Sequence, residues 1–184
     1  MKDFRILGIS GSLRKASYNS AALRVAQALA PDGVAIVLAD ISAIPLYDDD
    51  VRLAGLPPSV VTLGEEIASA DAVLIATPEY NYSIPGVLKN AIDWVSKVPV
   101  QPFSRKPLAI MGASMGAIGT ARSQYELRKV FVSLNAHVLN HPEIMIALAQ
   151  TRFDADGHLT DENTRELIGK LIVALKEWAL RLRD

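Results

Sequence analysis

The regular alternation of short apolar runs with longer segments of helical periodicity is the feature that most constrains this chain. Runs rich in Ile, Val, Leu and Ala are typical of strands buried on both faces of a parallel sheet. Five such strands are expected, at Phe4–Ser10, Val34–Asp40, Ala72–Pro78, Leu108–Ala113 and His137–Met145. Five helices are expected to accompany them, near residues 19–30, 58–70, 86–97, 119–134 and 161–183. This order predicts βαβ units in a three-layer α/β sandwich, with residues 1–184 forming a single domain.

The last expected helix has the clearest pattern. Apolar residues recur at helical spacing from Leu167 to Leu182, so they form one stripe along the helix. Thr160 can cap its first turn, and Asp161 and Glu162 suit its positive end.

The composition excludes several classes of protein. The 20 acidic residues nearly cancel the 19 Lys and Arg, and a net charge of −1 lacks the basic excess typical of nucleic-acid binding. The chain has no cysteine, which excludes disulfides, thiolate metal sites and a cysteine nucleophile. Any redox chemistry therefore needs a bound cofactor. No apolar run approaches the roughly 18 residues of a membrane helix, so we expect a cytoplasmic protein without a membrane partner.

The titratable residues predict neither a metal site nor a catalytic triad. His137 and His141 stand four apart in a strand-like run, and His158 is distant in sequence. The acidic run Asp48–Asp50 lacks the Gly and the distal Glu of a calcium loop, so we expect a solvated loop there.

The loop after the first strand is expected to bind a phosphate. Ligands of open parallel sheets bind beyond the carboxyl ends of the strands, where the strand order reverses. Residues 10–19 (SGSLRKASYN) combine three serines, Asn, Arg and Lys without any acid, directly before a helix. A helix N-terminus offers unpaired N–H groups and positive charge, and Arg14 can meet a phosphate. The alternative is ordinary capping by Ser17 or Asn19. Dinucleotide and P-loop glycine patterns are both missing, which favours a monophosphate.

The loops after the third and fourth strands are expected to bind a flat ring. Residues 77–86 (TPEYNYSIPG) place two tyrosines and an Asn at a strand end, which suits stacking and amide hydrogen bonds. Glu79 can bind a ring N–H or cap the following backbone, and both remain open. The three glycines of residues 112–119 allow close approach of a ligand or simply a tight turn. Together the three loops predict a flavin mononucleotide (FMN) site.

Three segments carry a resemblance to a known family: GSLRKASYN, TPEYNYSIPGVLKNAIDW and Ser114-Met115-Gly116. They resemble the NADPH-dependent FMN reductase family, and within it the bacterial chromate and quinone reductases. The resemblance implies a flavodoxin-like fold with a five-stranded parallel sheet in the order 2-1-3-4-5, bound FMN, and a homodimer or homotetramer. It implies that the first segment holds the phosphate and the other two line the isoalloxazine ring. The implied cofactor-binding residues are Ser12, Arg14, Ser17, Tyr18, Asn19, Pro78, Glu79, Tyr80, Asn81 and Ser114.

The activity implied is transfer of two electrons from NADPH or NADH, through FMN and by a ping-pong route, to small oxidants such as quinones or chromate. The flavin carries the chemistry, so no side chain is expected to be catalytic. A flavodoxin-type electron carrier is the first alternative, although such carriers are typically strongly acidic and this chain is balanced. A receiver-like signalling domain lacks its phosphorylatable Asp, because Thr77-Pro78-Glu79 ends the third strand. A free-flavin reductase or azoreductase remains open.

Overall fold

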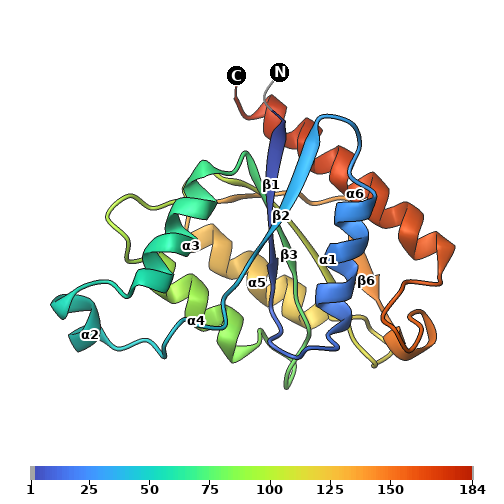
Figure 1. Ribbon diagram of the computed structural model, residues 1–184, viewed down its shortest axis with the longest axis horizontal. Coiled ribbons are helices and arrows are strands. Elements are labelled where there is room, and N and C mark those ends of the chain that lie inside the picture. Colours follow the sequence, from blue (N-terminus) through green and yellow to red (C-terminus); the bar gives the residue numbers. More distant parts are fainter. Residues whose placement is uncertain (1–2, 184) are drawn as a thin grey trace.

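A parallel sheet lies between two layers of helices in the computed structural model, which describes residues 3–183 (Figure 1). The strands are β1 (Phe4–Ser10), β2 (Val34–Ala39), β3 (Ala72–Ala76), β4 (Pro107–Ala113), β5 (His137–Val138) and β6 (Ile144–Ile146). The helices are α1 (Tyr18–Ala28), α2 (Asp49–Ala54), α3 (Pro58–Ser69), α4 (Gly86–Val95), α5 (Ala121–Ser133) and α6 (Glu162–Arg181), with a short 3₁₀ turn, η1 (Ala149–Thr151). The sheet order is β2-β1-β3-β4-β5, with β6 also beside β4, and every pairing is parallel. This confirms the expected flavodoxin-like fold.

Alternation along the central strands divides the core into two layers. Ile6 and Leu7 are adjacent in β1 and point to opposite faces, as side chains of a strand must. On the face of Ile6 the sheet is covered by α1 and α6, and on the face of Leu7 by α3, α4 and α5 (Figure 1). All five residues of β3 are buried, in agreement with the continuous apolar run that predicted a central strand.

The prediction of one long fifth strand is wrong, because its residues form two short strands. β5 pairs with the beginning of β4, at Pro107 and Leu108, whereas β6 pairs with the end of β4. Pro142 stands between the two strands, and a proline has no N–H to donate to a ladder. The sheet therefore has six strands rather than five.

The acidic run after β2 is part of a helix rather than a loop. Asp48 caps α2, its carboxylate accepting from the backbone N–H of Asp50 at 2.9 Å, and Asp49 pairs with Arg52 within the helix. Acidic side chains favour the first turn of a helix because they complement its positive end. The acids that indicated a solvated loop are thus the start signal of a short helix.

The start of α6 also differs from the prediction by one residue. The N-cap is Asp161, whose carboxylate accepts from the backbone N–H of Thr164 at 2.8 Å. Thr160 instead donates its hydroxyl to the backbone carbonyl of Arg152 at 3.0 Å. Both residues are of types that cap helices, and the bond from Thr160 to Arg152 leaves the cap to Asp161.

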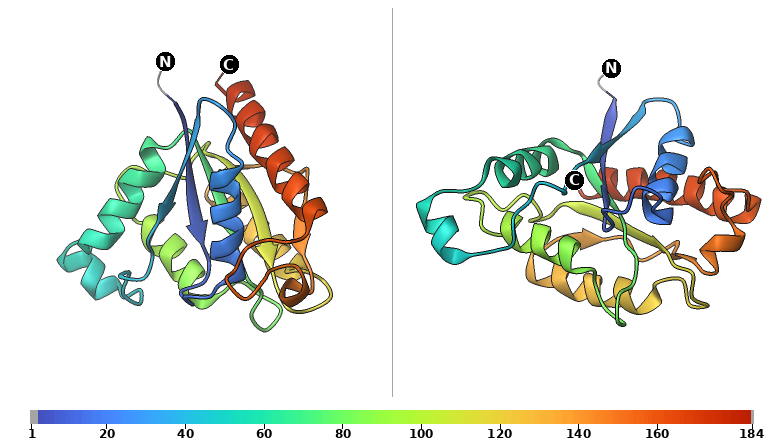
Figure 2. Two further views of the ribbon diagram at one scale, coloured as in Figure 1. Left: turned by 45° about the vertical axis from the view of Figure 1, so that its right-hand side comes forward. Right: turned by 60° about the horizontal axis from the view of Figure 1, so that its bottom comes forward.

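The loops that follow β1, β3 and β4 gather at one edge of the sheet, at the bottom of Figure 1 and brought forward in the right-hand view of Figure 2. Chain direction across the sheet reverses between β1 and β3, so this edge carries the switch point where ligands of such sheets bind. Within residues 3–183 no helix is both long enough and apolar enough to cross a membrane.

Candidate functional site

A pocket of about 270 Å³ opens at this edge, between the N-terminus of α1 and the loops after β3 and β4. Nine of the ten residues expected to bind a cofactor line it, and Asn81 does not. The nine are Ser12, Arg14, Ser17, Tyr18, Asn19, Pro78, Glu79, Tyr80 and Ser114. Ala113 and Met115 complete the lining. Segments a hundred residues apart in the chain therefore meet at one place, as the parallel sheet predicted.

The wall formed by the first loop presents hydrogen-bond donors. Ser17 caps α1, its hydroxyl accepting from the N–H of Ser20 at 3.3 Å. The N–H groups of Tyr18 and Asn19 have no acceptor among the described residues, as usual in the first turn of a helix. The Arg14 guanidinium donates to the carbonyl of Ala16 and lies 5.5 Å from the centre of the Tyr18 ring. Such a wall suits an anion.

Asn19 is committed to the sheet. Its amide nitrogen donates to the carbonyl of Ala113 at 2.9 Å, and its amide oxygen accepts from the N–H of the same residue at 2.8 Å. The residue is 3% exposed. Both ends of the amide are therefore used within the protein, so Asn19 contributes its backbone N–H to the pocket and its side chain to the scaffold.

The loop after β3 folds into a tight hairpin. Tyr80 and Ser83 exchange backbone hydrogen bonds of 3.1 and 3.0 Å, with Asn81 and Tyr82 between them at φ of 50° and 69°. Two successive residues with positive φ define a type I′ turn. This turn carries Asn81 out of the pocket, while Tyr80, 53% exposed, stays at the mouth.

Glu79 caps α5, a helix 43 residues further along the chain, rather than the backbone that follows it directly. One carboxylate oxygen accepts from the backbone N–H groups of Arg122 and Ser123 at 3.0 and 3.2 Å. The other accepts from the Arg122 guanidinium at 3.0 Å. The N-cap position of α5 is Thr120, which makes no side-chain cap, so Glu79 supplies the missing acceptor from 43 residues away. Glu79 is the one acid among the lining residues, and its ion pair with Arg122 offsets the repulsion that its charge would exert on a phosphate.

Arg122 contacts two residues of the β3–α4 loop, Glu79 and Tyr82, and the sequence did not identify it. Besides its ion pair with Glu79, its guanidinium lies 3.7 Å from the centre of the Tyr82 ring. Arg122 thus joins the hairpin of the β3–α4 loop to the start of α5. No local sequence pattern predicts this contact, because Arg122 is distant in sequence from Glu79 and Tyr82.

The glycine at the end of β4 is explained by packing within the protein. A Cβ on Gly112 would lie 2.0 Å from the Thr120 hydroxyl and 2.4 Å from the carbonyl of Thr77. Only a glycine allows this approach between the loops after β3 and β4. The next loop residue in the pocket, Ser114, is held by backbone bonds to Ile146 and Ala149, both of 3.0 Å.

Outside the pocket, Asp154, Asp156 and His158 offer ligand atoms within 4.8 Å of one another. All three are exposed, and the Asp154 carboxylate accepts from the backbone N–H groups of Asp156 and His158 at 3.0 and 2.7 Å. These bonds are those of a turn stabilised by an aspartate, which accounts for the cluster.

The residues of the pocket fit FMN. The first loop supplies N–H groups, hydroxyls and a guanidinium for a phosphate, and Glu79 is the one acid among the lining residues and is committed to α5. Pro78 and Tyr80 of the loop after β3 and Ser114 and Met115 of the loop after β4 offer the surfaces for a flat ring. Fold and pocket together define the class of protein: a doubly wound α/β protein with a mononucleotide site at its switch point.

The chain belongs to the NADPH-dependent FMN reductase family, whose model matches residues 4–151. Membership confirms the expected resemblance, the FMN cofactor with NAD(P)H dependence, and the assignment as an oxidoreductase enzyme.

Similar proteins agree along nearly the whole chain. An NAD(P)H-dependent FMN reductase of Pseudomonas aeruginosa is 60% identical over 181 residues, covering 98% of both chains. A quinone reductase of Escherichia coli is 43% identical over 185 residues, covering 99% of this chain and 98% of its own. Among solved structures, FerB of Paracoccus denitrificans, described as a flavoenzyme NAD(P)H:(acceptor) oxidoreductase, superposes with a TM-score of 0.86. It is 36% identical and covers 96% of this chain and 97% of its own.

Proposed function

We propose that the protein transfers two electrons from NAD(P)H to quinones by a ping-pong route, with FMN bound in the pocket between α1 and the β3–α4 and β4–α5 loops. The observation that carries the proposal is the joining of a donor-rich helix N-terminus to an aromatic hairpin in one pocket. The names of the Escherichia coli and Solanum tuberosum relatives, a quinone reductase and an NAD(P)H:quinone oxidoreductase, support quinones as the oxidants.

In this proposal the chain binds and orients the cofactor. Ser12, Arg14 and the free N–H groups of Tyr18 and Asn19 hold the phosphate. Pro78 and Tyr80 pack against the ring, and Ser114 lies at its far edge.

Backbone donors of the β3–α4 loop stabilise negative charge on the ring. Of residues 79–81, Tyr80 donates its N–H to Ser83, whereas the N–H groups of Glu79 and Asn81 have no acceptor within residues 3–183. Donors fixed in advance stabilise developing charge without reorganisation. Glu79 lines the pocket and Asn81 does not, so we assign this role first to the N–H of Glu79. Bound FMN supplies the redox chemistry, accepting electrons from the nicotinamide and passing them to the oxidant.

The open mouth of the pocket favours small flat oxidants. Tyr80 is 53% exposed and Met115 60% exposed, and both border the mouth. A shallow apolar border accepts planar rings by stacking and selects little between them. Quinones fit this border, and we propose chromate as a further oxidant on the resemblance to the chromate reductases.

We further propose a homodimer or homotetramer acting in the cytoplasm, where NAD(P)H is regenerated. Leu46, Leu53 and Val100 are 84%, 70% and 81% exposed, and we propose them as apolar contacts between subunits. Light scattering on the purified protein measures the assembly directly, and a monomer at micromolar concentration contradicts it.

The test of the activity has two stages. Purified protein loaded with FMN is mixed with NADPH or NADH without oxygen, and the visible flavin absorption is followed. Rapid bleaching, reversed by a quinone, is the expected result. Initial rates at varied NAD(P)H and quinone should then give the parallel-line pattern of a ping-pong enzyme. No bleaching would favour a flavodoxin-type carrier, whereas intersecting lines would exclude the ping-pong route. Faster turnover with free flavins or azo dyes than with quinones would favour a flavin reductase or azoreductase.

A further inference from the structure

The segment that joins β6 to α6 determines where Ser114 lies. The N–H of Ser114 donates to the carbonyl of Ile146, and the carbonyl of Ser114 accepts from the N–H of Ala149, both at 3.0 Å. Two residues further on, the carbonyl of Gly116 accepts from the N–H of Leu148 at 3.1 Å. These are bonds between two backbones, so the pocket wall at Ser114 follows the position of residues 146–149.

This segment contains a strained turn. Leu148 has φ 48° and ψ 44°, a left-handed conformation that L residues rarely adopt and that costs on the order of 1 kcal/mol. Such a conformation persists only where its surroundings hold it. On one side of the turn, the N–H and the hydroxyl of Thr151 both donate to the carbonyl of Leu148 at 2.8 Å.

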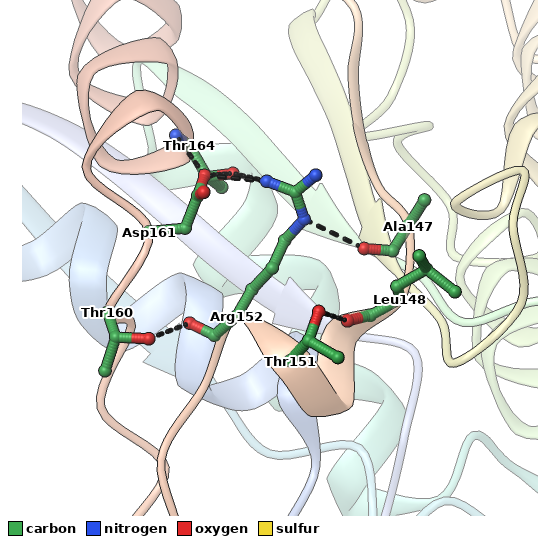
Figure 3. Close-up of polar contacts among 7 residues, drawn as sticks. All are labelled: Ala147, Leu148, Thr151, Arg152, Thr160, Asp161 and Thr164. Atoms are coloured by element: carbon green, nitrogen blue, oxygen red, sulfur yellow. Dashed lines mark hydrogen bonds and ion pairs between the residues drawn. The ribbon is translucent and has the colours of Figure 1, made fainter.

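Arg152 holds the other side of the turn. Its guanidinium lies between the carbonyl of Ala147, which accepts from Nε at 3.0 Å, and the carboxylate of Asp161, which pairs with Nη1 at 2.8 Å (Figure 3). Asp161 is also the N-cap of α6, so one carboxylate serves both the helix and the arginine. A planar fork with donors in fixed directions suits such a bridge.

The far end of the bridge is rigid. α6 is a helix of 20 residues, and one side of it is buried against the sheet through Ile168, Leu171, Ile172 and Leu175. The backbone of Arg152 is fixed as well, since its carbonyl accepts from the N–H and the hydroxyl of Thr160 at 2.8 and 3.0 Å. The placement of α6 is therefore transmitted through Arg152 to the turn at Leu148.

The residue after Arg152 contacts the opposite wall of the pocket. The ring of Phe153, 6% exposed, packs on that of Tyr18 with their centres 5.3 Å apart. Tyr18 is the first residue of α1 and lines the pocket. We call the side of the pocket formed by residues 12–19 the phosphate wall and the side formed by residues 78–80 and 113–115 the ring wall. Residues 146–153 thus contact the phosphate wall through Phe153 and the ring wall through the bonds to Ser114.

We propose that Arg152 is a positioning residue for FMN, fixing the Ser114 wall by clamping the turn after β6 to the N-terminus of α6. The role rests on the proposed function, because it requires FMN in the pocket. Within residues 3–183 the guanidinium of Arg152 bonds to Ala147, Asp161 and Thr164, none of which lines the pocket. Arg152 also lies just beyond the residues matched by the family model.

The test compares two arginines that each join a helix to a loop carbonyl. Arg152→Ala removes the clamp, and Arg128→Ala removes a bond of 3.0 Å from α5 to the carbonyl of Leu139, beside β5 and away from the pocket. The FMN dissociation constant of the apoprotein is measured by quenching of flavin fluorescence, together with denaturant unfolding. We expect Arg152→Ala to weaken FMN binding about tenfold, the scale of one charge-assisted hydrogen bond. Arg128→Ala should lower stability but leave FMN binding within about twofold of wild type.

Arg152→Lys distinguishes an effect on the position of the Ser114 wall from a general loss of folding stability. A single ammonium group can pair with Asp161 but cannot also donate from the Nε position to Ala147. We expect this variant to unfold nearly like the wild type yet bind FMN almost as weakly as Arg152→Ala, and it decides the matter if Arg152→Ala does not fold. Wild-type affinity in Arg152→Lys, or equal affinities in both alanine variants, would overturn the positioning role alone. A wild-type protein that binds no FMN would overturn both this role and the proposed function.

Discussion

The two walls of the pocket are built in different ways. The phosphate wall is local: Ser12, Arg14 and the first turn of α1 lie within ten residues of one another and mostly bond among themselves. The ring wall depends on distant partners, with Glu79 bound to the start of α5 and Ser114 bound to the segment after β6. Changes on the ring wall should therefore affect the fold and ligand binding together, whereas changes at Ser12 and Arg14 on the phosphate wall should affect ligand binding alone.

The largest effect is expected where the ring wall is most crowded. Gly112→Ala would place a Cβ 2.0 Å from the Thr120 hydroxyl, so the loops after β3 and β4 must separate. We expect the free energy of unfolding to fall by about 3 kcal/mol, the upper range for overpacking. Gly169→Ala is the matched control, since a Cβ there meets no atom within 4 Å. That change lies inside α6 and should raise stability by about 0.5–1 kcal/mol. Equal effects in denaturant melts would contradict the packing account of Gly112.

The next effect comes from removing the distant cap of α5. Glu79→Ala leaves two backbone N–H groups and the Arg122 guanidinium without their acceptor. We expect a loss of about 1–2 kcal/mol in unfolding free energy, as for other N-caps, together with weaker FMN binding. Glu79→Gln keeps an acceptor oxygen and should lose about half as much. FMN binding that weakens in Glu79→Ala without any loss of stability would mean that the carboxylate meets the ligand directly.

On the phosphate wall, Arg14→Ala should change binding without changing the fold. Arg14 is exposed, and its guanidinium contacts only nearby residues, Ala16 and Tyr18, among the residues that the structure describes. We expect an FMN dissociation constant about tenfold higher, with an unaltered melting temperature and an unaltered rate of reduction once the protein is saturated with FMN. The difference from wild type should shrink at high salt. Lys15→Ala serves as the control for net charge. An unchanged dissociation constant would remove Arg14 from the phosphate site.

The smallest effect concerns how stability falls at low pH because of Asp161, the carboxylate that pairs with Arg152 behind the ring wall. Hydrogen bonds from the side chain and backbone of Thr164, and the nearby Arg152, lower the pKa of Asp161 from its ordinary 3.8. A carboxyl with a lower pKa in the folded state contributes stability above its unfolded pKa and loses it as the pH falls through the folded value. Asp161→Asn should therefore flatten the decline of stability below about pH 4. Asp32→Asn removes an exposed carboxylate that makes no hydrogen bond or ion pair within residues 3–183, and should leave the decline as it is. Identical declines in all three proteins would refute the contribution of Asp161.

The sequence predicted what depends on neighbours along the chain. Apolar runs placed β1 to β4, and the acid-free loop before α1 indicated a donor-rich wall that the structure contains. The errors lie where a distant partner decides. Thr160 is a residue type that caps helices, but its hydroxyl bonds to the carbonyl of Arg152, eight residues earlier, and the cap is left to Asp161. The sequence places Glu79 among the expected site residues but does not show that it caps α5, because its partner lies 43 residues away and has no periodic signature.

The amide of Asn19 has a consequence for any redesign of the pocket. The side-chain amide both donates to and accepts from the backbone of Ala113, the last residue of β4. It therefore bonds to β4 as the peptide group of a neighbouring strand would. An aspartate could accept from Ala113 N–H but would face the Ala113 carbonyl with a second acceptor, and a serine is too short to span both atoms. Ligand preference therefore has to be altered through positions 12, 14 and 80, because position 19 belongs to the architecture although it borders the ligand.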